Sequence, residues 1–235
     1  VFEWYIGDIA YMTKDTKDDG AIVNIIKYHD ENPKYSKIEN TFQGKPCVPK
    51  MINNICNFTH RTELIIEQLL PLYMEGRCIL VLSDRRNHLL DIETGLKKHD
   101  IECGYYVGGM KPQGLRDAQE KNVILGTFSM ASEGMDIPKL NTMILASPKS
   151  DIVQSVGRIL RQKKDIRKFT PLIIDIDDEF GSFKNQSKKR LTFYNRCKYD
   201  ITIYEMDGTN YKYSKKKKGK QTKIIDITDI DECLL

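Results

Sequence analysis

Short apolar runs alternate with longer segments of helical periodicity along most of the chain. Continuous apolar runs predict buried strands, and they are CILVLS (78–83), VILGT (123–127), TMILAS (142–147) and PLIIDID (171–177). Between them, apolar residues recur every three or four positions, which indicates helices over 59–75 and from about 84 to 98, and a short helix that starts at Pro112. The run 101–107 adds a further strand. This alternation predicts an α/β fold whose mainly parallel sheet is covered by helices on both faces.

The two ends of the chain depart from this alternation. We expect residues 1–57 to form an N-terminal extension packed on the main domain, with a strand at 21–29 and a hairpin around Asp19–Gly20. The turn-rich stretch after that strand carries aromatics that could stack on nucleic-acid bases, although packing against the domain is favoured. The main domain is predicted over 58–206, and it includes a helix within 180–199 and a last strand at 201–206. Residues 207–235 are predicted to be a flexible, lysine-rich tail.

Composition narrows the class of protein. The 235 residues carry a net charge of +4, which permits a nucleic-acid partner without requiring one. No apolar run is long enough to span a membrane, and no signal-peptide pattern opens the chain. The six cysteines form no C-x-x-C pair, which favours an intracellular, reducing compartment. Because the chain opens on Val1 without a methionine, we expect it to be part of a longer protein.

The candidate chemistry lies between Thr127 and Arg161. Gly134 permits close approach of the backbone to a ligand, and Asp136 follows two residues later. A helix beginning near Ser150 or Asp151 is expected to present a polar face formed by Gln154, Arg158 and Arg161, and a buried stripe formed by Ile152, Val156 and Ile159. Arginines at this spacing suit a polyphosphate, because planar guanidinium groups bind phosphate oxygens in pairs. The alternative is an ordinary solvated basic face.

Two motifs in this stretch resemble those of a known family. GTFSMASEGMDIP (126–138) is similar to the fifth conserved motif of superfamily 2 helicases, and QSVGRILR (154–161) is similar to the sixth, Q-x-x-G-R-x-x-R. They occur in the family's order with a strand between them. The resemblance implies a RecA-like lobe, and specifically the second of the two lobes that bind ATP between them.

The resemblance also implies roles for individual residues. Arg158 and Arg161 would be the arginine fingers that face the γ-phosphate of ATP, with Gln154 beside them. Asp136 would contact the ribose, and Gly134 would let the backbone close on the nucleotide. The residues that would touch nucleic acid are Ser83, Arg85, Arg86, Gln113, Arg116 and Thr127. Leu160 replaces a glycine that many RNA-helicase members carry, which argues against a DEAD-box assignment.

A complete motor needs parts that this sequence lacks. The chain has no G-x-x-x-x-G-K-[ST] phosphate loop, because Gly44–Lys45 lacks both the upstream glycine and the following hydroxyl. We therefore expect ATP and Mg²⁺ to be bound mainly by a first lobe outside this chain, which would be its partner together with DNA or RNA. The chain alone is expected to show little or no ATP hydrolysis.

The segment DDEFGSFKNQSKKRLTFY (177–194) narrows the resemblance further. It is similar to the ending of a helicase group that includes the repair and transcription helicase XPB, a phage recombination helicase and the transcript-release helicase of poxviruses. This implies a role in viral transcription or in DNA repair and recombination, and an origin in a large DNA virus. The location would then be the cytoplasmic viral factory or the virion, with the nucleus as an alternative.

Two other functions remain open at this stage. One is a nucleic-acid-binding module without turnover, in which the lysine-dense segment 211–220 attracts phosphates and loses affinity as salt rises. The other is a magnesium-dependent nuclease, because IIDIDDEF places Asp177, Asp178 and Glu179 at the end of a strand, where clustered carboxylates can hold metal ions.

Overall fold

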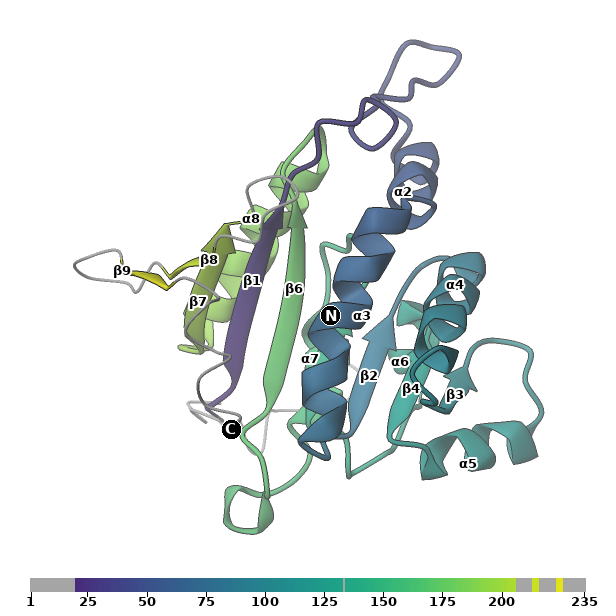
Figure 1. Cartoon of the computed structure of the whole chain (residues 1–235), viewed down its shortest axis with the longest axis vertical. Coiled ribbons are helices and arrows are strands. Elements are labelled where there is room, and N and C mark those ends of the chain that lie inside the picture. The colour runs from purple at the N-terminus through teal and green to yellow at the C-terminus, as the bar shows by residue number, and fades with distance from the viewer. Residues whose placement is uncertain (1–19, 133, 206–212, 216–222, 226–235) are drawn as a thin grey trace, which may run out of the picture.

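A computed structural model of the chain describes residues 20–205 except 133, together with 213–215 and 223–225 (Figure 1). Its centre is a seven-stranded sheet in the order β3-β4-β2-β5-β6-β1-β7, and every pairing in this sheet is parallel. The strands are β1 (Ile22–Tyr28), β2 (Ile79–Leu82), β3 (Cys103–Tyr106), β4 (Val123–Gly126), β5 (Thr142–Leu145), β6 (Leu172–Asp178) and β7 (Asp200–Glu205). The predicted parallel α/β sheet is therefore confirmed.

Helices cover both faces of this sheet, as predicted. One face carries α2 (Val48–Cys56), α3 (Thr59–Met74) and α4 (Arg86–Lys97), and the other carries α6 (Phe128–Ser132), α7 (Val153–Ile159) and α8 (Phe183–Arg196). The helix α5 (Pro112–Glu120) packs beside β3, where Gly104 lets the two approach. A short 3₁₀ turn, Lys164–Ile166, precedes β6.

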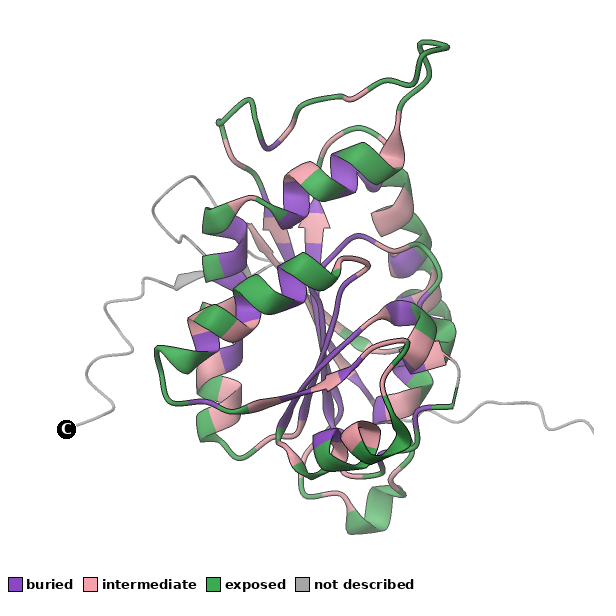
Figure 2. Ribbon diagram, turned by 90° about the vertical axis from the view of Figure 1, so that its right-hand side faces the viewer, coloured by how far each residue is buried: buried purple, intermediate pink, exposed green. Residues whose placement is uncertain are grey.

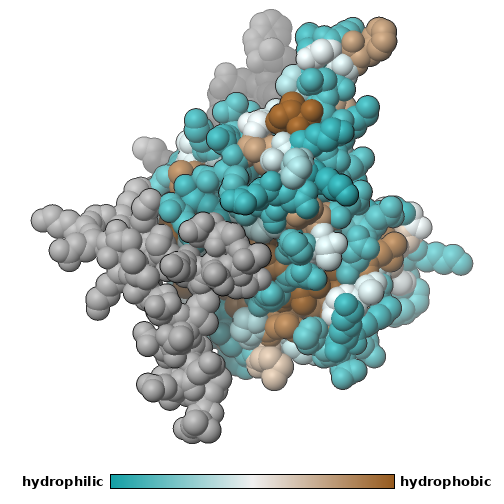
Figure 3. Space-filling model, turned by 45° about the horizontal axis from the view of Figure 1, so that its top comes forward, coloured by the Kyte–Doolittle hydropathy of each residue, from teal (hydrophilic) through white to brown (hydrophobic). Residues whose placement is uncertain are grey.

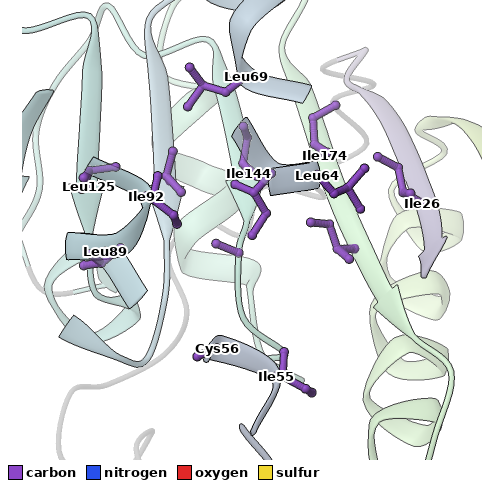
Figure 4. Close-up of a cluster of buried hydrophobic side chains, with 14 of the residues drawn as sticks. Ile26, Ile55, Cys56, Leu64, Leu69, Leu89, Ile92, Leu125, Ile144 and Ile174 are labelled. Carbon is purple, nitrogen blue, oxygen red and sulfur yellow. The ribbon is translucent and has the colours of Figure 1, made fainter. Parts of the chain in front are cut away.

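The core consists of two apolar layers, one on each face. Strand residues of β2, β4 and β5 are buried on both faces, so these strands have continuous apolar sequences (Figure 2). In the layer under α2, α3 and α4, side chains from helices and strands interdigitate (Figure 4), among them Ile55, Leu64, Leu89, Ile92, Leu125, Ile144 and Ile174. The other layer contains Val156, Ile159 and Tyr194 of α7 and α8. This arrangement fixes the loops at the carboxyl ends of the strands.

The N-terminal region differs from the expected extension. The predicted strand exists as β1, but it is an inner strand of the main sheet, paired in parallel with β6 on one side and β7 on the other. Both edges of β1 are occupied by parallel neighbours, and the hairpin expected around Asp19–Gly20 falls mainly on residues outside the described part of the chain. The four buried residues of β1, Val23, Ile25, Ile26 and Tyr28, belong to the lobe's core together with the adjoining Ala21. The limits proposed for the domains as a whole stay predictions.

The C-terminal tail lies mostly outside the described residues. Within 207–235, the structure describes the strands β8 (Tyr213–Lys215) and β9 (Lys223–Ile225), which pair antiparallel with each other. Most of the lysine-dense segment 211–220, with its expected flexibility and phosphate attraction, therefore stays a prediction.

Candidate functional site

The loops that follow β2, β4 and β5 meet at the carboxyl edge of the sheet, where an α/β fold of this kind places its ligands. Lys149 connects all three. Its ammonium lies 3.2 Å from a carboxylate oxygen of Asp84, in the loop after β2, and 5.4 Å from the ring centroid of Phe128, which begins α6 after β4. The backbone N–H of Asp84 donates to the hydroxyl of Ser147 at 2.9 Å. Nothing in the sequence distinguishes Lys149 from a surface lysine, and it was not predicted as a site residue.

Arg158 holds the loop between α6 and Asp136. Its guanidinium, half-buried, donates to the carbonyl oxygens of Ala131 at 2.6 Å, Ser132 at 2.6 Å and Met135 at 2.7 Å. The carbonyls of Ala131 and Ser132 are among those that the short helix α6 leaves unpaired at its end, and that of Met135 belongs to the loop that follows. Burial, and then the neighbouring charge of Arg161, lower the pKa of Arg158. Three of the five donors of this side chain are thus used within the lobe.

Arg161 lies beside Arg158 but is far less constrained. It forms an ion pair with Asp136, in which the side chains are 35% and 71% exposed. An exposed pair of this kind contributes only about 0–1 kcal/mol, so it opens readily for another partner. Gly134 has a backbone φ of +91°, and no atom of the described residues lies within 4 Å of the position that a Cβ would occupy. Arg158 and Arg161 therefore both contact the segment between α6 and Asp136, Arg158 through backbone carbonyls and Arg161 through the Asp136 carboxylate.

The helix that was predicted to carry Gln154, Arg158 and Arg161 is shorter than expected. It ends at Ile159, so Gln154 and Arg158 lie on α7 whereas Arg161 follows it. The carbonyl of Leu160 accepts an N–H of Arg167 at 3.0 Å, which satisfies a backbone group at the helix end without a further turn. Gln154 is exposed, and the predicted stripe of Ile152, Val156 and Ile159 is buried.

Two buried arginine–aspartate pairs support the loop from β5 to α7 from opposite faces of the sheet. Arg61 of α3 donates to both carboxylate oxygens of Asp178, at 2.7 and 2.9 Å, and to the carbonyl of Ala146 at 2.5 Å. Arg190 of α8 pairs with Asp175 at 2.8 Å and donates to the carbonyl of Lys149 at 2.8 Å. We did not predict either arginine as a site residue, because arginine is seldom buried. Arg61 lies in none of the segments that carry the resemblance, and Arg190 lies in the segment 177–194, whose residues were assigned no individual roles.

These pairs also bear on the carboxylates that suggested a nuclease. Asp175 and Asp178 are each neutralised by a buried arginine, and Asp177 accepts a hydrogen bond from the hydroxyl of Ser187. Burial raises the pKa of Asp177, which disfavours its charged form. In the part of the chain that the structure describes, no three His, Cys, Asp or Glu side chains converge as metal ligands. The geometry gives the nuclease alternative no support.

The residues predicted to contact nucleic acid fall into separate groups. Ser83 is fully buried, and its hydroxyl bonds to Nδ1 of His88 at 3.1 Å and accepts the N–H of Arg85 at 3.2 Å. Its hydroxyl therefore holds the start of α4 and does not face solvent. Arg85 donates to the carbonyl of Pro49 at 3.0 Å and to the side chain of Asn53, which joins the loop after β2 to α2. Arg86 is exposed and donates to the carbonyl of Gly108.

Gln113 and Arg116 form a second group on the exposed side of α5. The guanidinium of Arg116 donates to the side-chain carbonyl of Gln113 at 2.7 Å, and the Gln113 amide donates to Asp117 at 2.7 Å. Thr127 directly follows β4 at the carboxyl edge, with its hydroxyl 3.3 Å from that of Ser129. The structure does not bring the pair on α5 into contact with Thr127 or Arg85 through any hydrogen bond among the described residues.

His88 makes the stability of this edge depend on pH. It is fully buried, its Nε2 has no hydrogen-bond partner among the described residues, and burial together with the charge of Arg61 lowers its pKa to about 3. A lowered pKa means that the unfolded state binds the proton more tightly. Stability that is present above pH 6.5 is therefore expected to be lost as the pH falls toward 3, by as much as about 4 kcal/mol.

This expectation can be measured by urea unfolding across that pH range. In His88→Asn the extra loss between pH 6.5 and 3 should disappear, while His99→Asn, which changes an exposed histidine, should keep it. Parallel pH curves for the parent and His88→Asn would show that His88 is not the titrating group.

Comparisons with known proteins agree with this geometry. Residues 61–163 match the family model described as "Helicase conserved C-terminal domain". The chain is 36% identical over 211 residues to "Putative ATP-dependent RNA helicase L396" of Acanthamoeba polyphaga mimivirus, covering 87% of this chain and 40% of that protein. It is 26% identical over 113 residues to "Transcript termination protein A18" of fowlpox virus, covering 43% of this chain and 24% of that protein. The chain thus spans less than half the length of either relative.

The fold is also that of a solved structure. The crystal structure of T4 UvsW superposes with a TM-score of 0.62 at 20% identity, covering 81% of this chain and 42% of that one. The parallel sheet with its two helical layers therefore defines the chain as a RecA-like lobe. Residues 61–163 form a helicase conserved C-terminal domain, and the chain has the fold of the C-terminal lobe of a helicase. No helix among the described residues has the length and apolar character to cross a membrane.

Proposed function

We propose that this lobe completes the ATP site of a viral nucleic-acid helicase or translocase, in which Arg161 acts as an arginine finger and Arg158 supports the neighbouring loop. The observation that carries the proposal is the exposed Arg161–Asp136 pair at the carboxyl edge of the sheet. Its exposure leaves both side chains accessible to a ligand from a first lobe. Transcription or recombination is the pathway that we infer, because one relative is named as a transcript termination protein.

The residues at this edge fit one half of a nucleotide site. Asp136 offers a carboxylate that can accept hydrogen bonds from ribose hydroxyls, and Gly134 leaves space for close approach. Arg161 offers a charge that stabilises the negative charge which develops on a transferring phosphoryl group. The sequence contains no phosphate-loop motif. We therefore assign the phosphate loop and the ligands for Mg²⁺ to the first lobe.

Nucleic acid is the second proposed partner. Arg86, Gln113, Arg116 and Thr127 are exposed or half-exposed and can reach phosphates, as Arg85 can if its bonds to α2 exchange. Because the hydroxyl of Ser83 is buried, we leave it out of this set.

The test compares the chain alone with the longer protein that includes a first lobe. The chain alone should hydrolyse ATP no faster than buffer, whereas the longer protein should do so and should be stimulated by single-stranded DNA or RNA. A phosphate-release assay measures both. Hydrolysis by the longer protein that nucleic acid leaves unchanged would contradict the proposed motor, and hydrolysis by the chain alone would contradict the divided site.

A further inference from the structure

The loop between β1 and α2 ends in an aromatic side chain that the fold does not use. Figure 1 shows this loop projecting above the rest of the lobe, at the end of the sheet toward which β1 and β6 run. At its tip, Phe42 is fully exposed, at 108% of the reference area. Phenylalanine is ordinarily buried, and here it adds nothing to the core.

The tip is a closed turn that points Phe42 outward. The N–H of Gly44 donates to the carbonyl of Thr41 at 2.9 Å, so Phe42 and Gln43 occupy the corners of the turn. The N–H of Thr41 then donates to the carbonyl of Lys45 at 2.7 Å, and the N–H of Cys47 to that of Glu39 at 2.6 Å. Gly44 permits this turn because its backbone φ is +75°, a value that residues other than glycine rarely adopt. The aromatic ring is thus presented on a defined backbone.

The base of the loop is anchored in the core. Tyr35 is buried, its ring centroid lies 5.1 Å from that of Tyr28 and 5.0 Å from that of Phe180, and its hydroxyl donates to Asp178 at 2.6 Å. On the other side, the loop runs into α2, which Arg85 holds through the carbonyl of Pro49. The projecting tip is therefore connected directly to the proposed nucleic-acid edge after β2.

The charge around the tip indicates which partner it suits. From Asn40 to Asn57 the sequence contains Lys45 and Lys50 and no carboxylate. Earlier in the loop, the carboxylate of Glu39 is already paired with Lys37 at 2.8 Å. The surface that carries the loop is largely hydrophilic around it (Figure 3). An exposed ring with Lys45 three residues away and Gln43 beside it matches an unpaired nucleobase and its phosphate, since bases stack on aromatic rings while lysines attract the backbone.

We propose that Phe42 stacks on an unpaired base of the nucleic acid that this lobe grips, with Lys45 contacting the adjacent phosphate. This inference rests on the proposed nucleic-acid function and adds to it a contact outside the helicase motifs. We expected the aromatic residues of this loop to pack against the domain. Tyr35 does so, whereas Phe42 is fully exposed.

The test titrates the chain into single-stranded DNA and RNA oligonucleotides that carry 2-aminopurine, whose fluorescence is quenched by stacking. Phe42→Ala should bind about ten-fold more weakly and lose the quench, whereas Phe42→Trp should retain both. Lys45→Gln should weaken binding and flatten its salt dependence while the quench at saturation persists. Because Phe42 touches no core residue, urea unfolding should be unchanged in all three variants.

The outcomes separate this inference from the proposed function. If the parent chain binds and Phe42→Ala binds equally well with the same quench, the stacking contact is overturned while the nucleic-acid function stands; Phe42 would then serve another partner, such as the first lobe. If the parent chain binds neither oligonucleotide, both proposals fail. A duplex with flush ends should show no Phe42-dependent quench, because its bases are already paired.

Discussion

Arg161→Ala, made in the longer protein that carries a first lobe, is expected to lower the kcat of ATP hydrolysis by about a thousand-fold or more. The reason is that, among the described residues, Arg161 is held at this edge by an exposed ion pair with Asp136, so it can turn to a phosphate. Thermal unfolding of the variant should match the parent, because an exposed pair contributes about 0–1 kcal/mol. Steady-state phosphate release measures the first effect and circular dichroism the second.

Arg158→Ala provides a matched comparison from the same motif. It should also lower turnover, but with a loss of stability of about 1–3 kcal/mol, because three backbone carbonyls lose a charged donor. The two arginines of one motif thus separate into one available to the nucleotide and one that holds the loop before Asp136.

Arg196→Ala serves as the control, since Arg196 is exposed at the end of α8 and is assigned no role. Should Arg161→Ala retain the ATPase rate of Arg196→Ala, Arg161 would not be a finger. A rate restored by Arg161→Lys would point to charge alone rather than the planar guanidinium.

The strands and most helices could be predicted from the sequence because each buried element leaves a local signature. The continuous apolar run at 79–82 and the stripe of Leu89, Ile92 and Leu96 are examples, and all of these residues are buried. These features depend on residues close together in the chain.

Features that depend on distant residues could not be predicted. The strand β1 was expected, but its place between β6 and β7 is set by partners at 172–178 and 200–205, about which the segment 22–28 carries no information. The five-residue helix α6 is too short to show a period. Ser83 follows a strand, as a ligand-binding residue would, yet its hydroxyl is buried and bonded to His88. Its sequence position alone does not reveal this contact.

The two buried arginine–aspartate pairs show this limit of prediction most clearly. In the sequence, an arginine on a polar helix face cannot be distinguished from an arginine exposed to solvent. Arg61 lies in the segment THRTE, and only the fold shows that it reaches Asp178, which is 117 residues away. Arg61 also holds the carbonyl of Ala146, and Arg190 holds that of Lys149 from the opposite face. Both pairs therefore fix the segment that leads into α7, so the position of the proposed arginine finger depends on groups outside the two motifs at 126–138 and 154–161.

Removing Arg61 from its fully buried pair with Asp178 should have the largest effect on the stability of the chain. Arg61→Met is expected to lower the free energy of unfolding by about 3–5 kcal/mol, because it leaves the carboxylate of Asp178 buried, with the hydroxyl of Tyr35 as its remaining hydrogen-bond donor. Urea unfolding of the chain measures this. Lys27→Met, which breaks the partly exposed pair with Glu179 at 2.9 Å, should cost about 1 kcal/mol or less.

A double-mutant cycle separates the pair itself from packing. Asp178→Asn alone leaves Arg61 charged and buried, while the double variant removes both charges at once. The double variant should therefore be more stable than the sum of the single losses predicts, by several kcal/mol. Strict additivity would contradict a coupled pair. Because the carbonyl of Ala146 also loses its donor in Arg61→Met, the longer protein with this variant should lose ATPase activity even at temperatures where the lobe remains folded.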